Sequence, residues 1–454
     1  MTAVDPAEPP RAPIKAASAG ATSTSLLSRI LALAAPTSLV ALLQIIAQLA
    51  ETWIAARQGT AALAGWAVVL PFALLLQQMS TGAMGGGVVS AIARSLGAGR
   101  TQEASALVLH ALLIATAAGA LFAVVLAGFP RPVLGAIGGA TAADAAAAYA
   151  VWLFGAGAIP AWVANTLASV LRGGGRHALA ARVLTLAWAV LPLLAWCLAE
   201  PLGLGLAGLG VAYALVNWTA AIAMIVVVLR GGAGFTPNLR IRPSAALFRR
   251  ILAVGLVASM LAAIANLTTI FVTARVAKHG AAAVAAYGVS ARLEFLMIPL
   301  AFGVGSALTA LVGRAVGAGD WTTARRLAWT GGAMTLLAAG AVGITVGALP
   351  ATFAAVFSSD PEVLAIATRA LTFIAPAFGA FGLGMALYFA SMGAGRMAWP
   401  FAAAVSRFAI AVGGGWLLAD VAGFGLDGQF LAVALGITAY GVVTALGVRR
   451  RVWS

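Results

Sequence analysis

Long apolar runs constrain what this chain can fold into more than any other feature of its sequence. About 20 apolar residues are enough for a helix to cross the hydrocarbon core of a bilayer. Twelve runs of this length follow one another, separated by short polar or glycine-containing breaks. The sequence therefore predicts an all-α integral membrane protein with twelve transmembrane helices. The expected helices cover residues 30–55, 62–85, 105–128, 146–170, 179–199, 207–229, 249–275, 283–308, 326–349, 363–391, 400–419 and 428–448.

The overall composition excludes a water-soluble fold. Only 9% of the residues are charged and 62% are hydrophobic, whereas an ordinary soluble domain carries roughly 25% charged residues. The chain nevertheless has a net charge of +15, from 27 basic and 12 acidic residues. A basic excess of this kind is typical of nucleic-acid binding, of a membrane surface, or of an oriented membrane protein.

The distribution of the basic residues decides between these alternatives. With the N-terminus inside, alternate loops collect most of the arginines, which is the positive-inside pattern. It argues against a nucleic-acid partner. It predicts a multi-pass protein of the plasma membrane (the inner membrane of a bacterium) with both termini cytoplasmic. The inner loops hold Arg94, Arg100, Arg172, Arg176, Arg182, Arg230, Arg240, Arg242, Arg249, Arg250, Arg314, Arg325, Arg326, Arg396, Arg449, Arg450 and Arg451, and the outer side holds Arg57, Arg131, Arg275, Lys278 and Arg369.

The two halves of the chain repeat each other at an offset of 220 residues. Residues 94–100 match residues 314–320, both with an Arg-x-x-Gly-Ala-Gly motif, and residues 171–176 match residues 391–396. The offset spans six expected helices, an even number, so the halves are parallel repeats with the same orientation in the membrane. The expected domains are a disordered cytoplasmic tail (1–28), an N-terminal six-helix lobe (29–230), a cytoplasmic linker (231–248), a C-terminal six-helix lobe (249–448) and a basic cytoplasmic tail (449–454).

Two six-helix lobes suggest a secondary transporter that alternates access through a cavity between them. The sequence has no phosphate-binding Walker A loop, so we do not expect ATP hydrolysis by this chain. No pair of histidine, cysteine or acidic residues has a spacing suited to catalysis within a span, and the single cysteine, Cys197, excludes a disulfide within the chain. We therefore expect neither an enzyme nor a bound metal or cofactor.

Ionisable residues inside the expected spans are few, and each is a functional candidate because a charge in hydrocarbon is costly. Glu51 lies in the first expected helix, on the same face as Gln44 and Gln48. A carboxylate shielded from water should favour its neutral form and be able to load and release a proton. Glu51 is therefore the candidate proton-coupling residue. The alternative is a Glu51 near the outer headgroups that only pairs with Arg57.

Other polar residues are candidates for a substrate cavity, each with the alternative of an interhelical bond that only fixes packing. Asn165 is expected to bond to Glu51 or to substrate. Arg292 and Glu294 lie two residues apart in the eighth expected helix, so they point to different faces and each needs its own partner. The candidate cavity residues are Gln44, Gln48, Gln77, Asn165, Asn217, Asn266, Arg292 and Glu294.

Taken together, these motifs resemble those of the multidrug and toxic compound extrusion (MATE) transporters. Glu51-Thr52 stands where that family commonly has an Asp-Thr pair at the end of its first helix. The Gly-Ala-Gly loops at 97–99 and 317–319 and the Arg-Gly-x-Gly loop at 172–175 are similar to loops of the family. The resemblance implies two six-helix bundles around a V-shaped cleft and antiport of organic, often cationic, compounds.

The resemblance also implies a coupling ion. Some family members carry acids on their fifth, seventh or tenth helices, but the corresponding spans here have none, which favours protons over Na+. We expect a monomer that exports organic cations or drugs in exchange for protons (or Na+), with Glu51 as the coupling carboxylate. The alternative is a flippase for lipid-linked precursors from the same superfamily, which would need a basic cavity to bind pyrophosphate.

Overall fold

The structure, a computed structural model, describes residues 23–449 and Trp453, except for the side chains of residues 23, 24, 136–142 and 300. Every regular element in this part of the chain is a helix. Eleven helices, or twelve if one bent pair counts as a single span, are long and apolar enough to cross a bilayer. The predicted fold class is confirmed. Apolar spans form helices because lipid offers no hydrogen-bond partners, so each segment must satisfy its own backbone.

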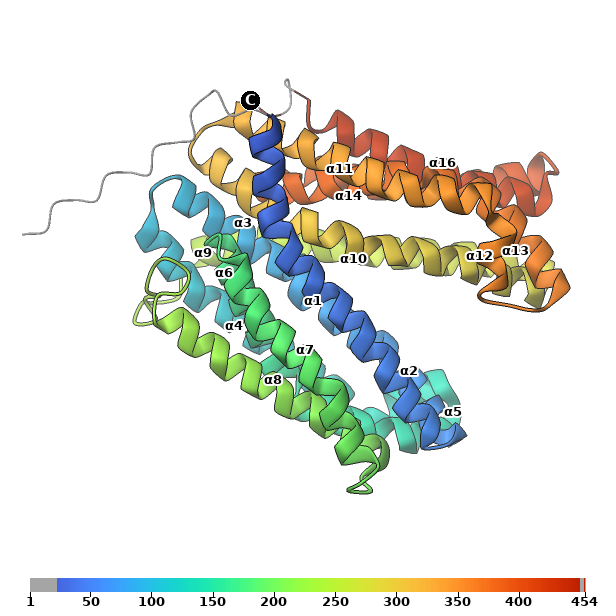
Figure 1. Ribbon diagram of the computed structural model, residues 1–454, viewed down its shortest axis with the longest axis horizontal. Coiled ribbons are helices and arrows are strands. Elements are labelled where there is room, and N and C mark those ends of the chain that lie inside the picture. The colour runs from blue at the N-terminus through green and yellow to red at the C-terminus, as the bar shows by residue number, and fades with distance from the viewer. Residues whose placement is uncertain (1–22, 450–452, 454) are drawn as a thin grey trace, which may run out of the picture.

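The first half of the chain builds one lobe (Figure 1). Its second span, Thr60–Gly97, passes through the π-helical segment η1 and still counts as one span. Its fourth span, in contrast, is bent by 47° at Gly157. The elements are α1 (Ser23–Arg57), α2 (Thr60–Gln77), η1 (Gln78–Ala83), α3 (Met84–Gly97), α4 (Thr101–Leu126), α5 (Pro130–Ala150), η2 (Val151–Ala156), α6 (Ala158–Gly173), α7 (His177–Ala199) and α8 (Gly205–Leu229).

The second half builds another lobe with the same succession of spans (Figure 1). Its tenth span is interrupted by a short 3-10 segment, and its eleventh span continues through two π-helical segments. The elements are α9 (Ala245–Val276), η3 (Ala277–His279), α10 (Ala281–Gly317), α11 (Trp321–Ala348), α12 (Pro350–Ala355), α13 (Pro361–Ile374), η4 (Ala375–Ala377), α14 (Phe378–Ala394), α15 (Ala398–Phe408), η5 (Ala409–Gly414), η6 (Leu417–Val421) and α16 (Gly425–Leu446).

The boundary predicted for the disordered tail was wrong. The first helix begins at Ser23, so residues 23–28 are helical, while residues 1–22 lie outside the described residues. The physical reason is that Leu26, only 3% exposed, packs into a hydrophobic cluster of the second lobe. Of the predicted basic tail, Trp453 is buried against Trp321, with ring centroids 6.2 Å apart.

The backbone confirms the repeat seen in the sequence. Glycines with positive φ recur at the same places in both halves, where the chain must turn in the left-handed region that only glycine adopts easily. Such a glycine ends the turn after α3, α6, α10 and α14. The pairs are Gly59 and Gly280 (φ 101° and 102°), Gly99 and Gly319 (74° and 77°), Gly175 and Gly395 (78° and 72°), Gly203 and Gly423 (67° and 79°), and Gly205 and Gly425 (55° each).

The two lobes meet at one end and diverge toward the other (Figure 1). We call the meeting end, where the loops after α3, α6, α10 and α14 lie, the closed end. The tips of α2 and α5 in one lobe and of α12 and α13 in the other lie at the open end. The arginine-rich loops that the sequence predicts to be cytoplasmic are those of the closed end.

Helix α1 contacts both lobes. Near the closed end, Leu26 and Ile30 share a buried cluster with Leu308 and Val312 of α10. Farther along, Ile54 belongs to the core of the first lobe. Pro36 lies within α1 between these two contacts, where it removes one backbone hydrogen bond of the helix. The helix thus joins the core of the first lobe to the contact between the lobes, with a proline in between.

Candidate functional site

Glu51 lies in the half of α1 nearer the open end and faces the interior of the first lobe. Glu51 is 7% exposed, and its Oε1 atom has no hydrogen-bond partner among the described residues. The buried side chains of Tyr149 and Tyr213 lie within electrostatic range of its carboxylate. Gln44 and Gln48, on the same helix face, are half-buried. Glu51 is thus a buried carboxyl group with aromatic rather than cationic neighbours.

The alternative that Glu51 pairs with Arg57 is wrong. Arg57 instead donates to both carboxylate oxygens of Glu200, with a distance of 2.6 Å from Nε to Oε1. The indole of Trp196 donates to the same carboxylate. Glu200 follows α7 at the open end, and the hydrogen bond from Arg57 holds the pKa of its carboxyl below the ordinary range. The exposed ion pair therefore leaves Glu51 free.

A second polar group in the first lobe is built around Asn165. Its Nδ2 atom donates to Ser80 Oγ at 2.9 Å and more weakly to Gln77 Oε1 at 3.4 Å. Gln77 in turn donates to Thr81 Oγ1 at 3.0 Å. This network joins α6 to the junction of α2 and η1. Asn165 bonds to these groups and not to Glu51, so that expected bond is not formed.

Two of the expected cavity residues satisfy themselves within their own helices. Asn217 donates to the carbonyl of Tyr213 one turn earlier, at 2.9 Å. Asn266 donates to the carbonyl of Ala262 at 2.8 Å and is exposed. Neither bond brings the asparagine to Glu51 or to the Asn165 group. An amide that is satisfied within its own helix does not depend on a tertiary partner.

The second lobe contains an ion pair that is largely, though not fully, buried. Glu294 of α10 pairs with Arg407 of α15, and the two side chains are 13% and 11% exposed. The Arg407 guanidinium also lies 5.5 Å from the ring centroid of Phe381. Arg292, in contrast, is exposed. The expectation that Arg292 and Glu294 point to different faces is confirmed, but Arg292 has no place beside Glu294 in a buried cavity.

At the closed end the two lobes approach each other through glycines. A Cβ atom built on Gly97 would overlap the carbonyl oxygen of Arg314, and one on Gly317 would overlap that of Arg94. The Arg314 Nη2 atom donates across the lobes to the carbonyl of Gly174 at 2.7 Å. The Arg94 guanidinium lies symmetrically against Gly395. These paired contacts are the physical reason for the Gly-Ala-Gly loops of the sequence.

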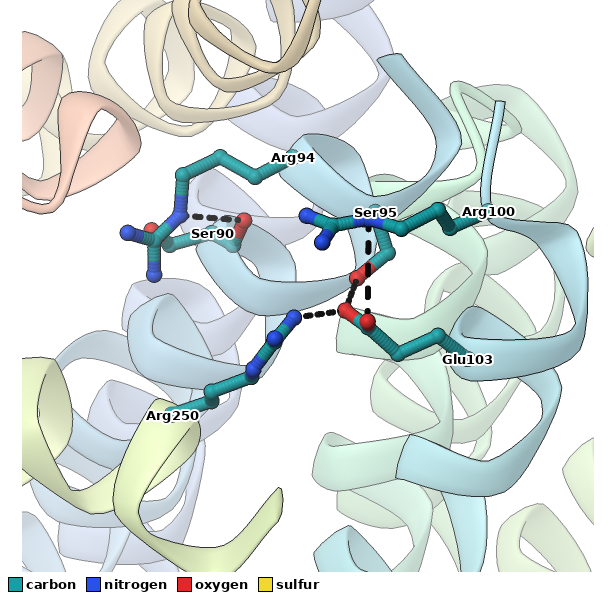
Figure 2. A network of polar contacts seen from close by, with 6 residues as sticks. All are labelled: Ser90, Arg94, Ser95, Arg100, Glu103 and Arg250. Atoms are coloured by element: carbon teal, nitrogen blue, oxygen red, sulfur yellow. Dashed lines mark hydrogen bonds and ion pairs between the residues drawn. The ribbon is translucent and has the colours of Figure 1, made fainter. Parts of the chain in front are cut away.

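An ionic network reinforces the closed end on one side (Figure 2). Glu103, at the start of α4, pairs with Arg250 of α9, which belongs to the other half of the chain. The same carboxylate accepts from Ser95 Oγ at 2.6 Å and pairs with Arg100 at 3.6 Å. The network thus ties the turn after α3 to the first helix of the second lobe.

Arg172 is buried between the lobes, a position that the sequence reasoning missed because it placed this residue in a loop. Arg172 is 3% exposed, and its guanidinium lies 5.8 Å from the ring centroid of Phe302. The cavity beside it measures about 10 Å³, roughly the room for one water. The lining residues come from both lobes: Thr81, Gly82, Gly86, Val89, Arg172, Phe302, Ser306, Thr309 and Phe389.

The fold and these contacts define a two-lobed membrane transporter. The MatE family model matches residues 36–196 and 254–417, more than half of the chain and parts of both lobes. The chain therefore belongs to the MATE family of transporters. Among curated proteins, no relative matches it.

Solved structures share this fold at low sequence identity. The Vibrio cholerae MATE transporter VcmN in its bent form aligns with a TM-score of 0.87 and 21% identity, over 95% of this chain and 98% of that one. A MOP superfamily transporter from Pyrococcus furiosus aligns with a TM-score of 0.86 and 20% identity, over 95% and 98% of the two chains. For the Pyrococcus furiosus protein, the reverse polarity of the binding pocket is said to suggest a different function.

Proposed function

We propose that this MATE-family transporter exports organic cations in exchange for protons, and that Glu51 alternately holds the proton and the charge of the substrate. The observation that carries the proposal is the burial of the Glu51 carboxylate with no ion-pair partner among the described residues. An ionised carboxylate in such a place is costly unless it is neutralised. A proton or a cationic substrate can do so, and the two compete for one group. Such competition is the basis of antiport.

The position of α1 supports a coupling of this group to the movement of the lobes. The helix carries Glu51 in the first lobe and packs with Leu26 and Ile30 against the second lobe at the closed end. A change in the charge of Glu51 alters how deeply its part of the helix is buried. Because α1 is one helix from Ser23 to Arg57, with Pro36 as the point where it can bend, that change is coupled to the contact between the lobes.

The orientation of the molecule completes the cycle. With the arginine-rich loops inside, the closed end faces the cytoplasm and the lobes diverge toward the outside. In this arrangement an external proton reaches Glu51 and displaces a cationic substrate outward. Opening of the closed end then lets the proton leave and a new substrate enter from the cytoplasm, as in rocking between two lobes.

The test is ethidium efflux from proteoliposomes driven by a pH gradient. Wild-type protein should export ethidium when the receiving side is acidic, and Glu51→Gln should fall to the rate of empty liposomes. Glu51→Asp should retain coupling with an altered pH profile, because it keeps the ionisable group. Glu200→Gln is the matched control, since this half-buried acid of the same lobe already pairs with Arg57.

Undiminished gradient-driven efflux in Glu51→Gln would refute the role of this residue. Efflux that follows a Na+ gradient and ignores the pH gradient would refute proton coupling. Unchanged thermal stability of the Glu51→Gln protein in detergent excludes misfolding as the cause of a lost activity.

A flippase for lipid-linked precursors is the second candidate function, and Arg172 is the observation that favours it. Its buried guanidinium lies in the seam between the lobes without an acidic partner among the described residues. A guanidinium is the side chain best suited to bind a pyrophosphate, which would enter this seam only after the lobes separate. The cavity beside it has a single arginine in its lining. For a flippase, Arg172→Gln should abolish transport of a fluorescent lipid pyrophosphate, and wild-type protein should not export ethidium.

A further inference from the structure

A hollow on the second lobe is lined by three arginines. It has a volume of about 440 Å³, within the range of roughly 300–1,000 Å³ that ligand pockets occupy. It lies between the first turns of α11 and the residues that follow α16. The lining residues are Thr322, Arg325, Arg326, Trp329, Val448 and Arg449.

The hollow carries an excess of positive charge. None of its three arginines forms an ion pair with a carboxylate within hydrogen-bond reach in the described part of the chain; Arg325 instead donates to the backbone carbonyl of Trp453 at 2.5 Å. One acid lies near: Asp320 caps α11 by accepting from the Thr323 amide at 2.9 Å and is within electrostatic range of Arg326. Three guanidinium groups against one carboxylate favour an anionic ligand.

The same hollow has an apolar wall at the level of the membrane. Trp329 lies two turns into the membrane span Trp321–Ala348 and is 42% exposed. Val448, which is buried, closes the hollow from the side of α16. Arginines at the end of a span beside an exposed tryptophan match the boundary between lipid headgroups and acyl chains. A free anion would contact only the arginines, whereas a lipid would contact the arginines with its headgroup and the apolar wall with its glycerol backbone.

The internal repeat offers a comparison for this site. At an offset of 220 residues, Arg325 and Arg326 correspond to Ser105 and Ala106 in the first lobe. There the linker covers the surface: Ser105 Oγ donates to the carbonyl of Thr236 at 2.7 Å. The linker contacts the same helix again farther on, where the amide of Ser244 donates to His110 Nε2 at 2.8 Å.

The two lobes therefore use equivalent surfaces differently. In the first lobe a protein segment and neutral side chains occupy the position. In the second lobe the position is basic, and no segment among the described residues fills it. We infer that this hollow binds the headgroup of an anionic phospholipid from the leaflet at the closed end, with its phosphate between the arginines and its glycerol backbone beside Trp329.

The experiment titrates the purified full-length protein in detergent with phosphatidylglycerol and counts bound lipids by native mass spectrometry. The Arg326→Gln/Arg449→Gln double variant should bind about 25-fold more weakly, since each arginine contributes about a factor of five at a membrane surface. Arg325 is left in place because it holds Trp453. The matched control is Arg240→Gln/Arg242→Gln, which removes two exposed arginines of the linker and should bind like wild type.

Three outcomes would overturn the inference. Equal weakening in both double variants would mean that only the total surface charge matters. Equal binding of phosphatidylcholine would remove the need for an anionic headgroup. Displacement of the lipid by inorganic phosphate at a concentration equal to that of the lipid would point to a free-anion site. A Trp329→Ala variant, which should weaken lipid binding without changing phosphate binding, separates the lipid from the anion directly.

Discussion

The two lobes treat their buried carboxylates differently. Glu51 in the first lobe has no ion-pair partner among the described residues, whereas Glu294 in the second lobe pairs with Arg407. Neutralising one member of a buried pair leaves the other charge uncompensated, so such a pair resists titration. An unpaired carboxylate has no such restraint. The comparison teaches that burial alone does not distinguish a coupling acid from a structural one, and that the partner does.

Removing the partner in the second lobe should have the largest effect on stability. Arg407→Gln leaves Glu294 buried and unpaired, so we expect the free energy of unfolding to fall by about 3–5 kcal/mol. Glu51→Gln should leave it nearly unchanged, because no ion pair is lost. Thermal unfolding of the purified proteins in detergent measures both.

The double variant Glu294→Gln/Arg407→Gln is the control for that prediction. It removes both charges together and should regain most of the lost stability. If Arg407→Gln and Glu51→Gln proved equally stable, the proposed difference between the two carboxylates would be wrong.

The closed end offers a test of whether the lobes are equivalent where they touch. Gly97→Ala and Gly317→Ala each place a methyl group against a backbone carbonyl of the other lobe. Overpacking of this kind costs about 1–3 kcal/mol, and separation of the lobes relieves it. Both variants should therefore widen the closed end, measured as the distance between spin labels at positions Gln102 and Thr322 in a protein whose Cys197 has been replaced.

Gly288→Ala is the matched control for these glycines. It lies in the same helix as Gly317, but a Cβ atom there meets open space. Its label distance should equal that of wild type. Widening in only one of the two seam variants would show that the lobes do not share the contact equally.

A smaller effect is expected from the ionic network on one side of the closed end. Glu103→Gln removes the ion pair between Glu103 and Arg250. The side chain of Glu103 is 17% exposed and that of Arg250 is 41% exposed. Partly exposed pairs contribute about 0–1 kcal/mol and are screened by salt. The loss of thermal stability should therefore be detectable at low NaCl and vanish at high NaCl.

This ionic network has no counterpart at the equivalent position of the second lobe. The position equivalent to Glu103 in the second lobe is Thr323, which has no charge. The exposed pair Arg131–Asp144, 74% and 75% exposed, is the control, and Asp144→Asn should change stability at neither salt concentration. A salt-independent loss in Glu103→Gln would mean that its bond to Ser95 matters more than the ion pair.

The smallest effect is expected at Glu200, a half-buried acid at the open end of the first lobe. Arg57 lowers the pKa of this carboxyl, so its contribution to stability is present above the ordinary glutamate pKa of about 4.3 and is lost only as the pH falls below it. Between pH 5.5 and 8 the pair does not titrate. Glu200→Gln should thus leave the pH profile of efflux unchanged, and a shifted profile would implicate Glu200 in coupling.

Much of the architecture could be predicted from the sequence because hydropathy and charge act locally. Each span is long enough to be recognised by itself, and the offset of 220 residues was visible in the loop motifs. Glu51 stood out because acids inside apolar spans are rare. The bend of 47° at Gly157 was not predicted, since a break within a continuous apolar run has little effect on hydropathy.

Residues close together in the chain fix the helical class and the two-lobe repeat, and they also single out Glu51 as a candidate, so all three can be predicted from the sequence. Which polar groups meet, in contrast, depends on how the helices pack. Glu294 and Arg407 lie 113 residues apart, and Asn165 and Ser80 lie 85 apart. Their pairing depends on how helices pack across the membrane, because a side chain in hydrocarbon finds its partner on a neighbouring helix rather than in water.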